Sequence, residues 1–217
     1  MFILSKRLSV ALRFLHGSRY LADIGCDHGY LPIEAVKSGI IQKAIASDNK
    51  QGPLDKARIN IREAGLETVI ETILADGITL LPSFVDTVSI LGMGGDQIAK
   101  ILDAGDTSVI ETLVLGPNSE AASVRRWLES HGFRITDEAF IKDHRHYYQI
   151  IQAKKGSMAL DPQEAAFGPI NIKRQDPLML EYLSYEINKL SLGLLKASKA
   201  KRKELEDKIN ALKGVYR

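Results

Sequence analysis

The first 150 residues alternate short apolar runs with longer amphipathic stretches, and this alternation constrains the fold more than any other feature. Five apolar runs are bounded by Gly, Asp or Pro, as strand ends usually are. They are residues 20–24, 43–47, 69–74, 87–91 and 109–115. Apolar residues recur at helical spacing within residues 31–38, 53–64, 95–102 and 119–131. Apolar strands separated by helices predict a parallel sheet with both faces covered.

The pattern changes after Gly132. Residues 133–141 and 146–153 are strand-like, and only four residues separate them. So short a connection favours an antiparallel hairpin over another crossover helix. Five alternating strands and a terminal hairpin predict an α/β fold with a doubly wound, seven-stranded, Rossmann-like sheet, which is typical of class I methyltransferases.

The C-terminal quarter has a different pattern. Residues 154–176 form a connector that contains glycines and prolines, and purely helical spacing follows Pro177. Two sets of apolar residues at heptad spacing, within 183–194 and 205–216, flank a polar and basic stretch. This predicts an antiparallel helical (coiled-coil) hairpin. We expect a catalytic domain over residues 1–160, and a connector with an α-helical coiled-coil domain over 161–217.

Composition excludes several other classes of protein. The chain has 217 residues, of which 45% are hydrophobic and 26% charged, as in ordinary globular proteins. No apolar stretch approaches the roughly 18–20 residues that a membrane-spanning helix needs. The single cysteine, Cys26, excludes a disulfide framework. We therefore expect a cytoplasmic protein with no membrane contact, no metal site and no obligatory protein partner.

The formal net charge of +2 is divided unevenly along the chain. Residues 1–172 contain 18 Lys and Arg against 21 Asp and Glu, whereas residues 173–217 contain 11 against 6. A basic C-terminal segment indicates binding to a polyanion such as nucleic acid, although solvated helix faces give the same numbers.

The most informative local motif follows the first predicted strand. That strand runs directly into Gly25-x-Asp27-x-Gly29 and then into a helix. Glycines at such a turn let a ligand approach the backbone closely. Dinucleotide enzymes place a pyrophosphate there, but a carboxylate at Asp27 repels phosphate and attracts a cation such as an amine or a sulfonium. The loop therefore favours S-adenosyl-L-methionine over NAD.

The next three strands each end in residues that fit the same cofactor. Asp48 follows the second strand, where an acid accepts hydrogen bonds from ribose hydroxyls. Asp76-Gly77 follows the third, where a short acid accepts from an adenine amine. The fourth runs into Gly92-Met93-Gly94-Gly95, which leaves room beneath the methionine end. The alternative is that these are helix-capping acids and turn glycines.

Further blocks of sequence extend the pattern over essentially the whole chain. They are Leu4-Ser5-Lys6-Arg7-Leu8, Gly52-Pro53, Pro117-Asn118, Arg126-Trp127-Leu128 and Phe167-Gly168-Pro169. With the glycine loop and Gly92-Met93-Gly94-Gly95, they resemble the bacterial tRNA (adenine-22-N1)-methyltransferase family. Two positions depart from the family pattern: Gly116 stands where Gln is usual, and Gly29 where Ala is frequent.

The resemblance implies an enzyme that transfers a methyl group from S-adenosyl-L-methionine to N1 of adenine 22, in the D-loop region of tRNA. N1 has its own lone pair, so alignment matters more than a strong base. N1 also lies on the Watson–Crick edge, so the base must be unpaired or flipped. The implied cofactor residues are Asp23, Gly25, Asp27, Gly29, Asp48, Asp76, Gly77, Gly92, Met93 and Gly94.

Four residues are candidates for the catalytic group: Asp27, His28, Tyr30 and Asn118. Tyr30 is placed to stack on a flipped base and Asn118 to hydrogen-bond the target adenine. The alternatives are that His28 bonds only the loop backbone and that Tyr30 is ordinary helix packing. Cys26 is expected to be a buried bystander, since a nucleophilic thiol needs a basic neighbour.

Basic residues near both ends are candidates for contact with tRNA phosphates. They are Lys6, Arg7, Arg13 and Arg19, and in the tail Lys199, Lys201, Arg202 and Lys203. The alternative is a solvated helix face for either group. Two other functions also stay open from the residues alone: a methyltransferase for another RNA, a small molecule or a protein, and a non-catalytic cofactor-binding or RNA-binding module.

Overall fold

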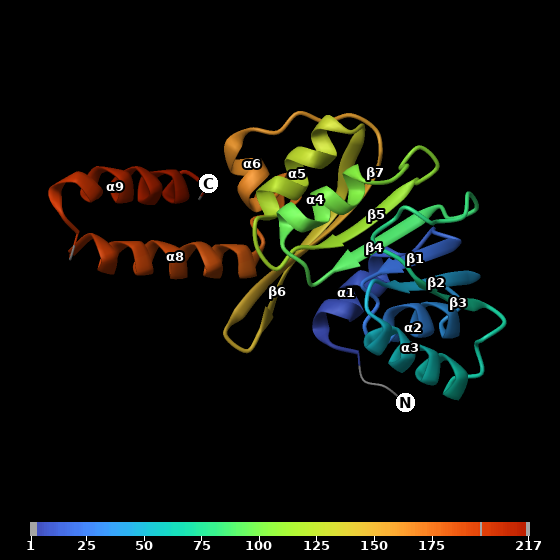
Figure 1. Ribbon diagram of the computed structural model, residues 1–217. Helices are drawn as coiled ribbons and strands as arrows, with labels where there is room; N and C mark the ends of the chain where they lie inside the picture. The colour runs from blue at the N-terminus through green and yellow to red at the C-terminus, as the bar shows by residue number, and fades with distance from the viewer. Residues whose placement is uncertain (1–3, 196, 216–217) are drawn as a thin grey trace.

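Seven strands form one sheet in the order β3-β2-β1-β4-β5-β7-β6 in the computed structural model, which describes residues 4–195 and 197–215 (Figure 1). The strands are β1 Tyr20–Ile24, β2 Lys43–Asp48, β3 Ile70–Leu74, β4 Thr87–Leu91, β5 Thr112–Gly116, β6 Phe133–Asp143 and β7 His146–Lys155. β1 to β5 are parallel, and β7 pairs antiparallel with both β5 and β6. The predicted doubly wound seven-stranded sheet is confirmed.

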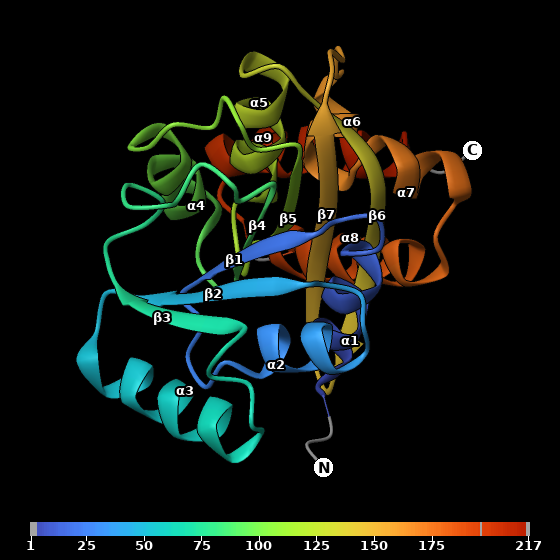
Figure 2. The ribbon, with the colours of Figure 1, turned by 90° about the vertical axis from the view of Figure 1, so that its right-hand side faces the viewer.

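Helices cover both faces of this sheet (Figure 2). They are α1 Lys6–Phe14, α2 Tyr30–Lys37 and α3 Gln51–Glu63 on one face, and α4 Gly95–Asp103 and α5 Ala121–Ser130 on the other. Side chains alternate between the two faces along each strand. Leu21 of β1 packs with α1 to α3, whereas its neighbour Ala22 packs with α4 and α5.

The first helix and the fifth strand differ from the sequence prediction. No element was predicted over residues 6–14, yet α1 forms there with Ser5 as its N-cap, because the Ser5 hydroxyl accepts from the Leu8 N–H at 3.3 Å. The fifth strand begins at Thr112 rather than at residue 109. Ile110 lies in a turn closed by its N–H on the Thr107 carbonyl, and it is apolar because it is buried in the core.

The predicted connector contains two short helices, α6 Pro162–Phe167 and α7 Pro169–Arg174. α6 begins with a capping box in which Asp161 and Glu164 each accept from the other's backbone N–H. The two helices lie against α5 and β6. The connector is therefore part of the packed structure of the sheet and is not a free linker.

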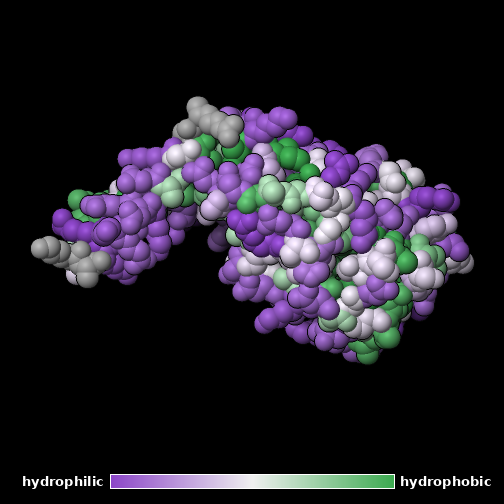
Figure 3. All heavy atoms as spheres, turned by 90° about the horizontal axis from the view of Figure 1, so that it is seen from above, coloured by the Kyte–Doolittle hydropathy of each residue, from purple (hydrophilic) through white to green (hydrophobic). Residues whose placement is uncertain are grey.

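The chain ends in a helical hairpin, α8 Pro177–Leu195 and α9 Lys199–Lys213, as predicted. It projects from the sheet (Figure 1) and its surface is mostly hydrophilic (Figure 3). An apolar cluster attaches it to β6: Phe140, Ile172, Met179, Leu183 and Val215. None of the helices in the described part of the chain is long and apolar enough to span a membrane.

A buried ion pair joins α5 to β6, and its arginine also holds the connector. The Arg125 guanidinium on α5 donates from Nε to Glu138 on β6 at 2.7 Å, and both side chains are fully buried. Arg125 also donates to the carbonyls of Ala165 and Ala166, each at 3.1 Å. Gly168 has φ +93°, and a Cβ there would collide with the Glu138 carboxylate, so this position requires glycine.

Candidate functional site

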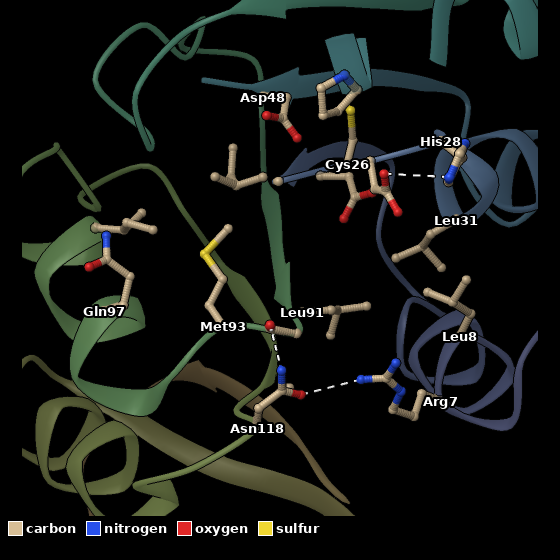
Figure 4. A pocket seen from close by; sticks show the side chains of 18 of the residues that line it. Arg7, Leu8, Cys26, His28, Leu31, Asp48, Leu91, Met93, Gln97 and Asn118 are labelled. Atoms are coloured by element: carbon tan, nitrogen blue, oxygen red, sulfur yellow. Dashed lines mark hydrogen bonds and ion pairs between the residues drawn. The ribbon is translucent and has the colours of Figure 1, made fainter. Parts of the chain in front are cut away.

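A cavity of about 520 Å³ opens at the carboxyl ends of the parallel strands (Figure 4). In doubly wound sheets this is the edge at which ligands bind, next to the point where strand order reverses. Here the reversal lies between β1 and β4. The cavity brings together most of the predicted site residues: Arg7, Asp23, Gly25, Asp27, His28, Tyr30, Asp48, Asp76, Gly77, Gly92, Met93 and Asn118.

The glycine loop after β1 forms the floor of the cavity. The N–H groups of Gly25 and Cys26 donate to the Ser47 carbonyl at 2.8 and 3.0 Å, which fixes the loop to the end of β2. Gly25 has φ +70°, and a Cβ there would collide with the Met93 methyl group. The left-handed backbone conformation therefore favours glycine at this position, and a larger residue would also displace the Met93 side chain.

Asp23, at the end of β1, is a buried carboxyl group that lines the cavity. The Ser89 hydroxyl donates to it at 2.6 Å. Burial raises the pKa of Asp23 to about 7, against the opposing effect of the Ser89 hydrogen bond. A carboxyl group in this state gains most from a positively charged ligand, so the structure fits the ammonium or sulfonium of the predicted cofactor.

The raised pKa of Asp23 makes cofactor affinity depend on pH. Below a pH of about 7 the Asp23 carboxyl group is mostly protonated, and it must lose its proton before it attracts a cation. The Kd for S-adenosyl-L-methionine should therefore decrease as the pH rises from 5.5, and become constant above a pH of about 7. Calorimetric titrations across this range measure the effect. Asp23→Asn is the control, because it removes the carboxyl group to which the pH dependence is assigned. Parallel pH profiles for the two proteins would contradict this assignment.

Two further carboxylates stand at the ends of β2 and β3. Asp48 is buried, and its Oδ1 accepts from the Lys50 N–H at 2.9 Å. Asp76 is exposed and accepts from the Asn49 side-chain amide at 3.4 Å. Each carboxylate keeps acceptor capacity facing the cavity, which fits hydroxyl and amine donors of a nucleoside.

Three side chains from separate elements meet on the opposite wall. Asn118 follows β5, and its Nδ2 donates to the Gly92 carbonyl at 2.6 Å. Its Oδ1 accepts from Nη1 of Arg7 on α1 at 3.3 Å, as the dashed lines in Figure 4 show. The Arg7 guanidinium also lies over the Tyr148 ring, 4.2 Å from its centroid. Arg7, which was predicted to contact phosphate, therefore lines the cavity.

Asp27, His28 and Tyr30 lie at the mouth of the cavity. The rings of His28 and Tyr30 stack at 5.3 Å between centroids, and His28 Nε2 is 3.6 Å from Asp27 Oδ1. Asn60 fixes this segment by donating to the His28 carbonyl at 2.8 Å. Asp27 itself has φ +49°, a conformation that costs free energy in a non-glycine residue and is frequent at ligand sites.

Cys26 lines the same cavity but is buried, and burial raises the pKa of its thiol well above the usual range, with Asp23 adding to the effect. A thiol that stays protonated is a poor nucleophile. The structure agrees with the expectation that Cys26 takes no part in chemistry.

Some predicted residues lie outside the cavity. Gly29 and Gly94 are the N-caps of α2 and α4 and adjoin it. Lys6 faces a second, shallower depression beside Lys142. Arg13 is exposed on α1, and Lys201, Arg202 and Lys203 are exposed on α9. The Lys199 side chain lies outside the described residues.

Other cavity residues were not identified from the sequence: Ser5, Leu8, Asn49, Lys50, Gln97, Tyr148 and Gln149. Gln149 is a polar residue between Tyr148 and the buried Ile150 on β7. No local pattern in the sequence distinguished it as part of a second wall of the site.

Comparison with known proteins gives a consistent match. The family model of the tRNA (adenine(22)-N(1))-methyltransferases, TrmK, matches residues 21–214. The Bacillus subtilis tRNA (adenine(22)-N(1))-methyltransferase is 30% identical over 98% of this chain and 96% of its own length. Streptococcus pneumoniae Sp1610 in complex with S-adenosyl-L-methionine is 35% identical, with a TM-score of 0.92 over 99% of this chain and 100% of that one.

A third relative adds a bound product. Mycoplasma capricolum TrmK in complex with S-adenosyl-homocysteine is 32% identical, with a TM-score of 0.89 over 100% of both chains. These matches confirm the family, the enzyme class and the cofactor predicted from the sequence. The chain belongs to the tRNA (adenine(22)-N(1))-methyltransferase family, whose members are S-adenosyl-L-methionine-dependent enzymes.

Proposed function

We propose that this chain transfers the methyl group of S-adenosyl-L-methionine to N1 of adenine 22 in tRNA, in the cytoplasm. The observation that carries the proposal is the division of one cavity into two different walls. The ends of β1, β2 and β3 contribute carboxylates, whereas Arg7, Asn118 and Tyr148 form a wall without acids on the other side. A cationic cofactor and a neutral base can therefore bind side by side.

The acidic wall is assigned to the cofactor. Asp23, Gly25, Asp27 and Gly29 hold the methionine end, and Gly92, Met93 and Gly94 lie beneath it. Asp48 accepts from the ribose hydroxyls, and Asp76 with Gly77 contacts the adenine. The buried Asp23 and the open floor at Gly25 support this orientation.

The second wall is assigned to the target base. Bound S-adenosyl-L-methionine supplies an electrophilic methyl group, to which N1 forms a bond with its lone pair as the carbon–sulfur bond breaks. The protein holds the base in line for that step. Asn118 Oδ1 accepts from Arg7 with one lone pair, and with its second lone pair it accepts from the adenine N6 amine. Tyr30 stacks on the flipped base, and Asp27 and His28 close the mouth of the site.

Labelled-methyl transfer to an unmodified tRNA transcript tests this function. We expect one methyl group per tRNA molecule, and none in a transcript in which adenine 22 is replaced by uridine. Equal labelling of the two transcripts, or labelling of neither, would refute the assignment of the target.

The role of Asn118 predicts a specific kinetic defect. Asn118→Ala removes the acceptor for the N6 amine, so kcat/KM for tRNA should fall by about tenfold to a hundredfold, while the Kd for S-adenosyl-L-methionine is unchanged. Asn49→Ala is the matched control, since Asn49 is an amide on the cofactor side of the same cavity. At a saturating concentration of S-adenosyl-L-methionine, Asn49→Ala should leave kcat/KM for tRNA unchanged. Wild-type kinetics for Asn118→Ala would show that Asn118 does not contact the target adenine.

We also propose that residues 1–160 are the catalytic domain and that residues 161–217 contribute to tRNA binding. Lys201, Arg202 and Lys203 form an exposed basic cluster at the start of α9. Phosphate neutralisation by such a cluster gives affinity that depends on salt.

Charge reversal tests whether the basic cluster at the start of α9 binds tRNA. Replacing Lys201, Arg202 and Lys203 by Glu should weaken tRNA binding at least about tenfold. It should also reduce the magnitude of the negative slope of log K against log salt by about three. Reversal of the exposed Lys56 and Arg62 on α3 is the control and should change neither quantity. Gel-shift titrations at several salt concentrations measure both. An unchanged slope would exclude the cluster from the interface.

A further inference from the structure

One polar residue that lines the cavity, on its second wall, has no role in the proposed function. Gln149, on β7, lines the cavity beyond the end of β5. Leu115 pairs with Ile151, so the residues after β5 run alongside the residues before Ile151. Arg7 contacts both Asn118 and Tyr148, which also shows that these two segments adjoin. Gln149 therefore lies in the part of the site assigned to the target base.

A hydrogen bond from Arg125 fixes the orientation of the Gln149 side-chain amide. Nη2 of Arg125 donates to it at 2.6 Å. Because a guanidinium group only donates hydrogen bonds, the atom facing Arg125 is the amide oxygen Oε1. Nε2 consequently faces away from Arg125. Among the described residues Nε2 has no hydrogen-bond partner, and it is not one of their buried unpaired atoms, so part of its surface is exposed.

Arg125 holds this orientation firmly. Its side chain is fully buried, and Glu138 and two backbone carbonyls of α6 bind its other nitrogens. The guanidinium cannot turn away without breaking these bonds. The Gln149 amide is thus set before a substrate arrives, which is the condition for a group that aligns a reacting base.

We propose that Gln149 is a substrate-positioning residue whose Nε2 donates to N7 of the target adenine. Asn118 Oδ1 and Gln149 Nε2 then offer an acceptor and a donor from neighbouring segments, which match the N6 donor and N7 acceptor on the Hoogsteen edge of adenine. Binding by that edge leaves N1 free to react. Guanine, with an acceptor at position 6, does not fit. The inference rests on the proposed function, because it concerns how that same site holds its base.

Two tRNA transcripts test the proposal, one with adenine at position 22 and one with 7-deazaadenine, which lacks N7. With the wild-type enzyme, kcat/KM should be about tenfold lower for the 7-deaza transcript. Equal values would overturn the proposal without any change to the protein. Failure of the wild type to methylate the adenine transcript would instead refute the proposed function.

Gln149→Glu supplies the matched variant, because it keeps an oxygen facing Arg125 but loses the Nε2 donor. We expect about a tenfold loss on the adenine transcript and no additional loss on the 7-deaza transcript. The Kd for S-adenosyl-L-methionine and the Tm should match those of the wild type. Additive losses, or wild-type kinetics for Gln149→Glu on both transcripts, would overturn the role of Gln149.

Discussion

Arg125→Met should lower the free energy of unfolding by about 3–5 kcal/mol, because it leaves the Glu138 carboxylate buried without its ionic partner. The substitution also removes the donors that bind the α6 carbonyls and Gln149. Desolvation already raises the pKa of Glu138, against the effect of Arg125, so the lone carboxyl would be protonated more readily. Urea denaturation followed by circular dichroism measures the loss.

The neighbouring Arg126 provides the control. It forms a partly exposed pair with Glu129 at 2.7 Å, and such pairs contribute roughly 0–1 kcal/mol, so Arg126→Met should be far less destabilising than Arg125→Met. The double variant Arg125→Met with Glu138→Leu should recover much of the loss, since it removes the buried charge. A loss below about 1 kcal/mol for Arg125→Met alone would contradict the proposed contribution of the pair.

Asp48→Ala should weaken binding of S-adenosyl-L-methionine by about tenfold to a hundredfold. Asp48 is a buried carboxylate at the end of β2, and hydrogen bonds to a charged acceptor contribute about 1.5–3 kcal/mol each. We assign its remaining acceptor capacity to the ribose hydroxyls of the cofactor. Isothermal titration calorimetry with the cofactor measures the change.

Asp55→Ala is the matched variant for this measurement. Asp55 is an exposed acid on α3 that pairs with Arg58 at 2.8 Å and does not line the cavity. Its loss should leave cofactor affinity unchanged. Equal affinity for Asp48→Ala and the wild type would show that Asp48 does not contact the ribose.

The fold could be predicted from the sequence wherever local pattern and tertiary role agree. The apolar run at 87–91 is both strand-like and buried, and it became β4 with the expected bounds. Ile110 misled the prediction, because its burial results from packing in a turn and not from a strand. α6 was missed although Asp161 and Glu164 form a capping box, which is a recognisable helix start.

The two walls of the site differ in how well the sequence predicted them. Asp23 and Asp48 lie at the carboxyl ends of β1 and β2, and Asp76 follows β3, so topology alone brings the three acids to one edge of the sheet. The other wall depends on contacts between distant segments. Arg7 reaches Asn118 across 111 positions in the chain, and no local pattern predicts that contact. Arg125 resembles an ordinary charge on an amphipathic helix until its burial is known.

The central claim, methylation of adenine 22 at N1, is tested most directly by identifying the modified nucleoside and its position. Unmodified tRNA transcript is incubated with the enzyme and S-adenosyl-L-methionine, digested, and analysed by mass spectrometry beside nucleoside standards. Our account predicts 1-methyladenosine in the fragment that contains position 22 and in no other fragment. N6-methyladenosine, or 1-methyladenosine at another position, would contradict it.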